Sequence, residues 1–336
     1  RAGRLPIQIL TGPRQVGKTE LLRHTLGPKA KIIDLDDLGT RDGVRRDPAL
    51  YLGEIRAPLL IDEAQFAPEV FHELKLRVDR ARREETKLPP IWLTGSSMTL
   101  LDREVKESLA GRASYHSLHG LSVHELGPRF NFETALFRGG WPELYRDPEL
   151  DPVASLDDYL RSFVEKDIAL LSGVEKMDAF LKSLRLLAGR TGQVLNASEI
   201  GGQAGAKGQT LTDWISLLDR HSIVKKLPAF FTNSNKRLIK SPKIYFLDIA
   251  LASRLQGWRS ADPVLVSPAA GPLFETLVFS EIVKARDHFS LPIDLYFYRT
   301  KEGEEIDFLL SIETPNGRVG IAIESKLAVQ GDPEVS

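Results

Sequence analysis

The stretch that decides the fold is Ile9-Leu10-Thr11-Gly12-Pro13-Arg14-Gln15-Val16-Gly17-Lys18-Thr19, near the start of the chain. The apolar run at residues 5–10 predicts a buried strand, and residues 20–24 predict the start of a helix. The pattern between them, G-x-x-x-x-G-K-T, is typical of a phosphate-binding loop and has the strand–loop–helix context that such a loop requires. We therefore expect this segment to bind a nucleoside triphosphate; the alternative is a chance glycine-rich turn.

The residue types of this loop have chemical reasons. Gly12 and Gly17 allow backbone conformations and a close approach that a side chain would block. N–H groups of the loop and of the helix N-terminus would face the phosphates. Lys18 adds a positive charge there, and the Thr19 hydroxyl would complete the coordination of a Mg²⁺ ion. The expected cofactors are ATP and Mg²⁺, and the candidate binding residues are Gly12, Pro13, Arg14, Gln15, Val16, Gly17, Lys18 and Thr19.

A second apolar run, at residues 58–61, leads into Asp62 and Glu63. This form is typical of a buried parallel strand that delivers carboxylates to its C-terminal edge, where open α/β sheets bind their ligands. Asp62 would hold Mg²⁺ through its water shell, and Glu63 would polarise the attacking water, because phosphoanhydride hydrolysis needs an oriented nucleophile more than a strong base. The alternative is that the two acids cap the next helix.

Further elements extend this first half. Residues 31–35 predict a strand, residues 36–48 a polar connection, and residues 69–85 an amphipathic helix. The strand predicted at residues 91–97 turns polar at its end, which places Thr94 or Ser96 beside Asp62. Such a side chain would sense the terminal phosphate or position water, unless the segment is only a Gly-Ser turn.

Arg112 follows the predicted end of a helix and is a candidate arginine finger, acting in cis or from a neighbouring subunit. The alternative is an arginine that interacts with the dipole of its own helix C-terminus. A role in trans would require a homo-oligomer, and a role in cis would not.

The composition of the 336 residues is that of an ordinary soluble globular protein, long enough for two or three domains. The formal net charge is −1, so any nucleic-acid site must be a local patch. The sequence contains no cysteine, which excludes disulfides, thiolate metal sites and a thiol nucleophile. No apolar run approaches the roughly eighteen residues of a membrane span, so we expect a cytoplasmic location without a membrane partner.

The second half predicts several smaller modules. Amphipathic stretches at residues 157–171 and 176–188 predict a helical lid or connector, at 146–190, after an ATPase core at 1–145. Two capping-box-like starts, at residues 196–199 and 210–213, predict a helix-turn-helix. With the β-ribbon predicted after it, this segment is expected to form a winged helix at 191–258.

The segment from Arg220 to Leu247 is rich in basic residues and contains no Asp or Glu. Such a run is a candidate surface for contacts with the phosphates of duplex or branched DNA. The alternatives are that the module docks on a protein, or that the basic ribbon only faces solvent. The candidate DNA-binding residues are Arg220, Lys225, Lys226, Lys236, Arg237, Lys240 and Lys243.

The last module, expected at 259–336, has an acid inside an apolar strand, Asp307, and the pattern Glu324-x-Lys326 on the next strand. These motifs resemble the PD-(D/E)XK nuclease superfamily. The resemblance implies that Asp307 and Glu324 share a Mg²⁺ ion, that Glu275 completes the site from a helix, and that Lys326 orients or activates water. The alternative is a scaffold whose acids are structural.

The motifs of the whole chain resemble the prokaryotic AAA+-type ATPases that carry a C-terminal domain of unknown function, a group similar to archaeal origin-binding-like ATPases. The resemblance implies Walker A, Walker B, sensor 1 and arginine-finger roles for the loop, Asp62–Glu63, Thr94 and Arg112. The expected fold is an α/β P-loop NTPase with a parallel sheet and a helical lid, followed by a winged helix and a small α/β nuclease-like domain. The expected function is Mg²⁺-dependent ATP hydrolysis coupled to DNA binding or remodelling; the rivals are a nucleotide-gated protein-binding switch and an ATP-regulated nuclease.

Overall fold

The chain divides into two compact units, Arg1–His119 and Gly120–Ser336. The computed structural model describes residues 5–95, 108–164, 168, 174, 176–230, 241–300, 303–314 and 317–327. The boundary lies earlier than the one expected at residue 145. The reason is packing, because Leu136 and Leu144 are buried in the same helical core as Leu156 of the second unit.

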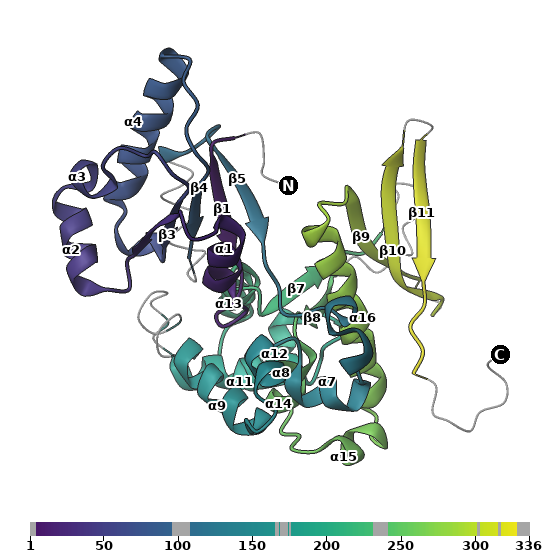
Figure 1. Cartoon of the computed structure of the whole chain (residues 1–336). Helices are drawn as coiled ribbons and strands as arrows, with labels where there is room; N and C mark the ends of the chain where they lie inside the picture. The colour runs from purple at the N-terminus through teal and green to yellow at the C-terminus, as the bar shows by residue number, and fades with distance from the viewer. Residues whose placement is uncertain are drawn as a thin grey trace. The chain divides into compact units, whose positions relative to one another are not determined.

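The first unit is built on a five-stranded sheet in the order β2-β3-β4-β1-β5, with every neighbouring pair parallel (Figure 1). Its elements are β1 (Ile7–Thr11), α1 (Lys18–Leu26), β2 (Lys31–Asp34), α2 (Leu38–Arg46), α3 (Pro48–Leu52), β3 (Leu59–Asp62), a 3-10 turn (Ala64–Phe66), α4 (Glu69–Arg83), β4 (Ile91–Thr94) and β5 (Ala113–Ser117). This is the parallel α/β sheet predicted from the sequence, and it is of the P-loop type.

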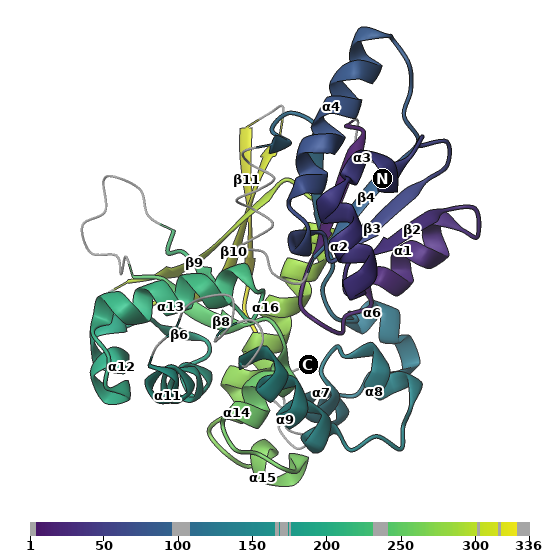
Figure 2. The same cartoon turned by 90° about the vertical axis from the view of Figure 1, so that its left-hand side faces the viewer.

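Successive side chains of β1 and β3 enter different cores, because side chains alternate between the two faces of a sheet. Ile9 and Ile61 lie in the core that contains Phe71 of α4. Leu10 and Leu60 pack instead against Leu22 of α1. Helices therefore cover both faces, as Figure 2 shows, and the central strands carry apolar side chains on both faces for this reason.

Helix α4 confirms the amphipathic helix expected at 69–85, whereas the polar connection expected at 36–48 is wrong. That segment contains α2 and the start of α3. Helix α2 buries only Val44 and begins at Leu38, directly after Asp37, whose carboxylate accepts a hydrogen bond from the Thr40 N–H. Capping at its first turn, rather than an apolar stripe, marks this helix.

The second unit combines a helical part with two antiparallel three-stranded sheets, β6-β8-β7 and β11-β10-β9. Its elements are α6 (Val123–Leu126), a 3-10 turn (Gly127–Arg129), α7 (Phe132–Arg138), α8 (Pro142–Arg146), α9 (Pro152–Ser162), α11 (Met177–Ala188), β6 (Gln193–Val194), α12 (Ala197–Ala204), α13 (Gly208–Arg220), β7 (Val224–Leu227), β8 (Lys243–Phe246), α14 (Ile249–Leu255), α15 (Ala261–Leu265), α16 (Ala270–His288), β9 (Ile293–Arg299), β10 (Glu305–Thr314) and β11 (Gly317–Ile323).

Helix α16 joins the two sheets of this unit. Its Phe279 stacks on Tyr245 of β8 at 4.3 Å between ring centroids and lies 6.0 Å from Phe308 of β10. The sheets also touch directly, because the Phe297 N–H of β9 donates to the Pro228 carbonyl at 3.0 Å. One core, centred on α16, therefore holds both sheets.

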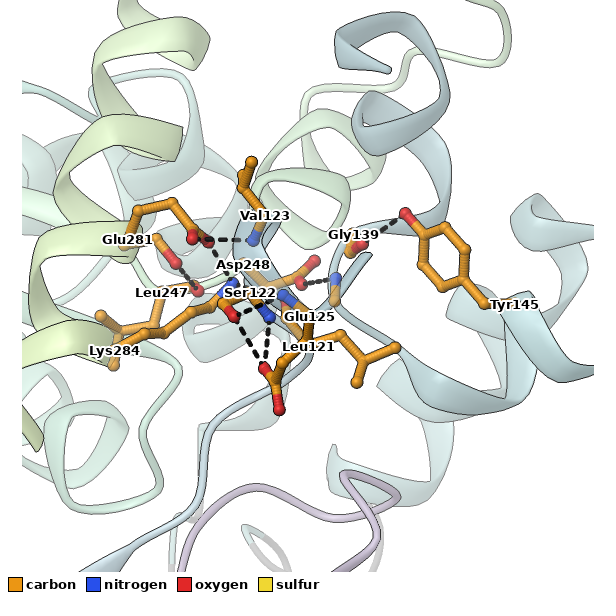
Figure 3. A network of polar contacts seen from close by, with 12 residues as sticks. Leu121, Ser122, Val123, Glu125, Gly139, Tyr145, Leu247, Asp248, Glu281 and Lys284 are labelled. Atoms are coloured by element: carbon orange, nitrogen blue, oxygen red, sulfur yellow. Dashed lines mark hydrogen bonds and ion pairs between the residues drawn. The ribbon is translucent and has the colours of Figure 1, made fainter. Parts of the chain in front are cut away.

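Polar contacts tie the start of the second unit to its helices (Figure 3). On α16, Glu281 accepts from the Val123 N–H at 2.8 Å, and Lys284 donates to the Leu121 carbonyl at 2.9 Å. Asp248, which caps α14, also accepts from the Gly140 N–H at 2.9 Å and from the Trp141 indole at 3.2 Å. The first residues of the unit are thus held by side chains more than a hundred positions later.

Across the part of the chain that the structure describes, we find no helix of the length and hydropathy that a membrane crossing would require.

We predict that Asp248→Ala destabilises the second unit by about 2–4 kcal/mol, because it removes a helix cap and leaves polar donors of the neighbouring backbone unpaired. Urea unfolding followed by tryptophan fluorescence measures this. Asp158→Ala is the control: its carboxylate is 76% exposed, so its effect should stay within about 0.5 kcal/mol. Equal effects of the two changes would contradict the role given to Asp248.

Candidate nucleotide-binding site

The strand register brings the predicted site residues of the first unit to one edge of its sheet. Leu10 pairs with Thr94 between β1 and β4, and Ile61 pairs with Leu93 between β3 and β4. Asp62 and Thr94 therefore end their strands at the same level, directly beside the loop that follows β1. This is the carboxyl edge, at which parallel α/β sheets bind ligands.

The loop after β1 requires glycine at two positions. Gly12 has φ of +145° and Gly17 of +89°, which side-chain-bearing residues rarely adopt. A Cβ at Gly12 would also collide with the carbonyl oxygen of Leu118, in the segment that follows β5. The Lys18 side chain crosses this loop, is 7% exposed, and donates to the carbonyl oxygens of Gly12 at 2.9 Å and Pro13 at 2.7 Å.

Asp62 connects three of the predicted residues. Its Oδ2 accepts a hydrogen bond from the Thr19 hydroxyl at 2.6 Å, and its Oδ1 accepts one from the Thr94 hydroxyl. The Thr94 oxygen also accepts from the Glu63 N–H at 3.3 Å. A hydroxyl and a carboxylate side by side are hard oxygen ligands of the kind that Mg²⁺ takes, together with water and phosphate oxygens. The donor set fits this ion.

Glu63 follows the strand in a left-handed conformation, with φ of 52°, which turns its side chain out of the strand's path. Its carboxylate accepts a hydrogen bond from the amide of Gln65, a residue only 5% exposed whose own Oε1 is buried without a partner. Gln65 is a site residue to which the sequence assigned no role. Its position two residues after Glu63 was the feature of the sequence that could have indicated this role.

A further carboxylate, that of Asp36, lies at this edge. Partial burial and the charges of Glu63 and Asp34 raise the pKa of Asp36 above its usual value. Like charges so close together make the edge favourable for a cation.

Arg112 is not where a finger in cis would need it. It directly precedes β5, and its carbonyl accepts from the Ile7 N–H at the start of β1, so it lies at the amino edge, opposite the loop. Its guanidinium forms two hydrogen bonds with Asp79 of α4, at 2.7 and 2.8 Å. This pairing raises the pKa of Arg112 and lowers that of Asp79. The arrangement in cis is therefore wrong.

The acids expected to form a nuclease-like metal site are not gathered into one. Glu275 contacts Lys243 and Tyr245, and Asp307 accepts from the N–H and hydroxyl of Ser325 at 2.8 and 2.9 Å. Glu324 and Lys326 point into solvent, with side chains 64% and 73% exposed. Among the described residues, no group of three or more His, Cys, Asp or Glu side chains is placed to hold a metal ion. The shared Mg²⁺ site therefore gains no support from these residues and stays a prediction.

The candidate DNA-binding residues of the basic segment lie in different environments in the structure. Lys243 is buried, 2% exposed, and paired with carboxylates, so its assignment to DNA is wrong. Arg220 is exposed at the end of α13, Lys225 pairs with Asp219 at 2.9 Å, and Lys226 is half-buried on β7. The other candidates, Lys236, Arg237 and Lys240, lie outside the described residues, as does Ser96.

In comparisons with known proteins, three family models match successive segments of the chain. A family model described as an AAA domain matches residues 4–127. Two further models, described as domains of unknown function DUF8612 and DUF4143, match residues 129–262 and 270–335. Uncharacterized proteins of Mycobacterium tuberculosis and Mycobacterium bovis are each 31% identical over 312 residues, covering 92% of this chain and 68% of the relative.

The chain belongs to the family of these mycobacterial proteins. Within this family architecture, the loop, Asp62, Glu63 and Thr94 all fall in the AAA domain, which is the ATPase type expected from the motifs. Arg112 lies in the same domain, whereas every basic residue and acid singled out in the second half falls in the two domains of unknown function.

Among solved structures, the ORC2 protein of Aeropyrum pernix has a TM-score of 0.36 at 13% identity and covers 84% of this chain and 89% of that one. The RuvB Holliday junction branch migration motor of Thermotoga maritima has a TM-score of 0.31 at 17% identity, with 66% and 82% covered. TM-scores this low do not establish a likeness in the arrangement of the whole chain.

We predict that Gly12→Ala lowers nucleotide affinity at least tenfold and destabilises the first unit, because the new methyl group collides with the Leu118 backbone at a left-handed φ. Titration with a fluorescent ATP analogue and thermal unfolding measure the two effects. Gly202→Ala is the control, because it lies in α12 with open space around it; it should leave nucleotide affinity unchanged and should not lower stability. Normal affinity in Gly12→Ala would show that the close approach is not needed.

Proposed function

We propose that the first unit binds ATP with Mg²⁺ and hydrolyses it. The observation that carries this proposal is the convergence of Lys18, Thr19, Asp62, Glu63 and Thr94 at one edge of a parallel sheet, with Asp62 bonded to both hydroxyls. The AAA domain match over the same residues supports it.

Each residue of the site has a separate role in the proposed hydrolysis of ATP. The loop's N–H groups and the Lys18 ammonium bind the phosphates, and positive charge there stabilises negative charge on the transferred phosphoryl group. Thr19 and Asp62 would hold the Mg²⁺ ion, which supplies further charge neutralisation when bound. Glu63 orients the attacking water, and Thr94 holds Asp62 and the Glu63 backbone in place. Gln65 positions the Glu63 carboxylate.

In this proposal, Arg112 acts as an arginine finger at the nucleotide site of a neighbouring copy of the chain. At the amino edge its guanidinium cannot reach the loop of its own sheet, so a finger role requires a neighbouring subunit. The Asp79 pair would then open on assembly, because the guanidinium cannot keep both hydrogen bonds while it contacts a phosphate.

We predict that Glu63→Gln binds ATP normally but hydrolyses it at least about a hundredfold more slowly, because the amide cannot polarise water as a carboxylate does. Lys18→Ala should instead lose ATP binding, since a charged contact with the phosphates disappears. Calorimetry with ATP and a phosphate-release assay separate the two. Glu69→Gln, an exposed acid on α4, should change neither. Normal hydrolysis by Glu63→Gln would refute its role.

We further propose that the second unit binds duplex or branched DNA through a winged helix, formed by α12, α13 and the sheet β6-β8-β7. The supporting observations are the two short helices before an antiparallel sheet and the outward position of Arg220 at the end of α13. ATP turnover would then be coupled to DNA binding or remodelling. The rival is a nucleotide-gated switch that binds protein with the same surface.

We predict that the double change Arg220→Ala with Lys226→Ala weakens duplex binding and lowers the slope of log affinity against log salt by about 2, since each lost phosphate contact removes close to one unit. Fluorescence anisotropy at several salt concentrations measures this. Lys182→Ala removes one exposed positive charge from α11 and is the control. Unchanged affinity and slope in the double variant would favour the protein-binding switch.

A further inference from the structure

Lys243 is a buried cation held between two acids that come from different elements. It begins β8, and its ammonium lies 2.9 Å from Glu275 Oε1 on α16 and 2.7 Å from Glu305 Oε1 on β10. The face of Phe297 covers it at 5.5 Å from the ring centroid. The ammonium therefore occupies the point at which two carboxylates converge.

Other protein groups also contact the acids of this cluster. Tyr245 donates its hydroxyl to the same oxygen of Glu275 that accepts from Lys243. Arg299 lies 3.5 Å from the second oxygen of Glu305. Asp307, whose charge acts on the Tyr245 hydroxyl, accepts its two hydrogen bonds from Ser325. Glu275 and Asp307, two of the acids suggested as metal ligands, thus each accept hydrogen bonds from groups of the chain itself.

The charge state of the cluster agrees with its geometry. Burial lowers the pKa of Lys243, but Glu275 and Glu305 more than offset this, so that its pKa lies above the usual value. Burial and the Glu275 charge raise the pKa of Tyr245, which therefore stays a neutral donor. A buried ammonium between two carboxylates is stable because each charge is paired and hydrogen-bonded.

We propose that the Lys243 ammonium is the permanent cation of this cluster and takes the place that a divalent metal ion would need. The module at the end of the chain is then a metal-free scaffold that joins β8, α16 and β10. The exposed pair Glu324–Lys326 lies outside the cluster and contributes no ligand to it. On this proposal, the ATP-regulated nuclease lacks the Mg²⁺ site that these acids were expected to provide.

Removal of the lysine tests this assignment. The full-length chain is used without nucleotide, and every protein carries Asp62→Asn so that the nucleotide site does not contribute. Binding of Mn²⁺ is followed by electron paramagnetic resonance. We expect no Mn²⁺ at the cluster with Lys243 present, and one additional site in Lys243→Ala, with a dissociation constant on the order of 0.1–1 mM, as for a site with few carboxylates.

Two further variants define the origin of that gained site. Adding Glu275→Gln and Glu305→Gln to Lys243→Ala should abolish it. Lys326→Ala, the matched removal of an exposed lysine, should gain none. The proposal is overturned if a protein with Lys243 binds Mn²⁺ in a manner that Glu305→Gln removes, or if a folded Lys243→Ala gains no site.

A second measurement decides the matter if Lys243→Ala does not fold, as judged by circular dichroism. With Lys243 intact, Glu275→Gln and Glu305→Gln should each lower the thermal midpoint by several degrees, and by the same amount in EDTA and in Mn²⁺. A Mn²⁺-dependent rise in the midpoint of the parent, lost in either variant, would overturn the proposal.

Discussion

The hydrogen bond between Thr19 and Asp62 joins residues 43 positions apart, and the first unit is arranged so that it forms. It requires β1 and β3 to run parallel, with one strand between them, and to end at the same level. It also requires the loop after β1 to turn tightly enough for α1 to begin at Lys18, which two left-handed glycines allow. Sheet order, loop conformation and the position of the acid are thus parts of one constraint.

The second unit depends on a different element, the long helix α16. Its successive turns carry Glu275, which pairs with Lys243, then Phe279, which packs between the sheets, and then Glu281 and Lys284, which hold residues 121–123. Because charged and apolar contacts alternate around it, α16 has no single apolar face, as expected of a helix enclosed by its own unit. The helix that was expected to carry Glu275 is therefore confirmed, with contacts on several of its faces.

Sequence patterns within short segments correctly predicted the elements that depend on neighbouring residues. The loop, the strand before Asp62 and helix α4 follow from spacing within about ten residues, and the structure confirms these elements. Helix α2 was missed because capping by Asp37 replaces an apolar stripe. The position of Arg112 at the amino edge, and the burial of Lys243 against Glu275 and Glu305, depend on pairings between distant segments. The number of basic residues in a segment does not indicate which of them will pair with distant acids.

Three lysines of this chain show why residue type is not enough to assign chemistry. Lys18 is buried against carbonyl oxygens, which solvate an ammonium but leave its charge, so the loop remains attractive to phosphate. Lys243 is buried against two carboxylates, which cancel the charge and give it a structural role. Lys326 is exposed beside Glu324, where water screens the pair. The partner and the burial of each ammonium, rather than the motif around it, determine what it can bind.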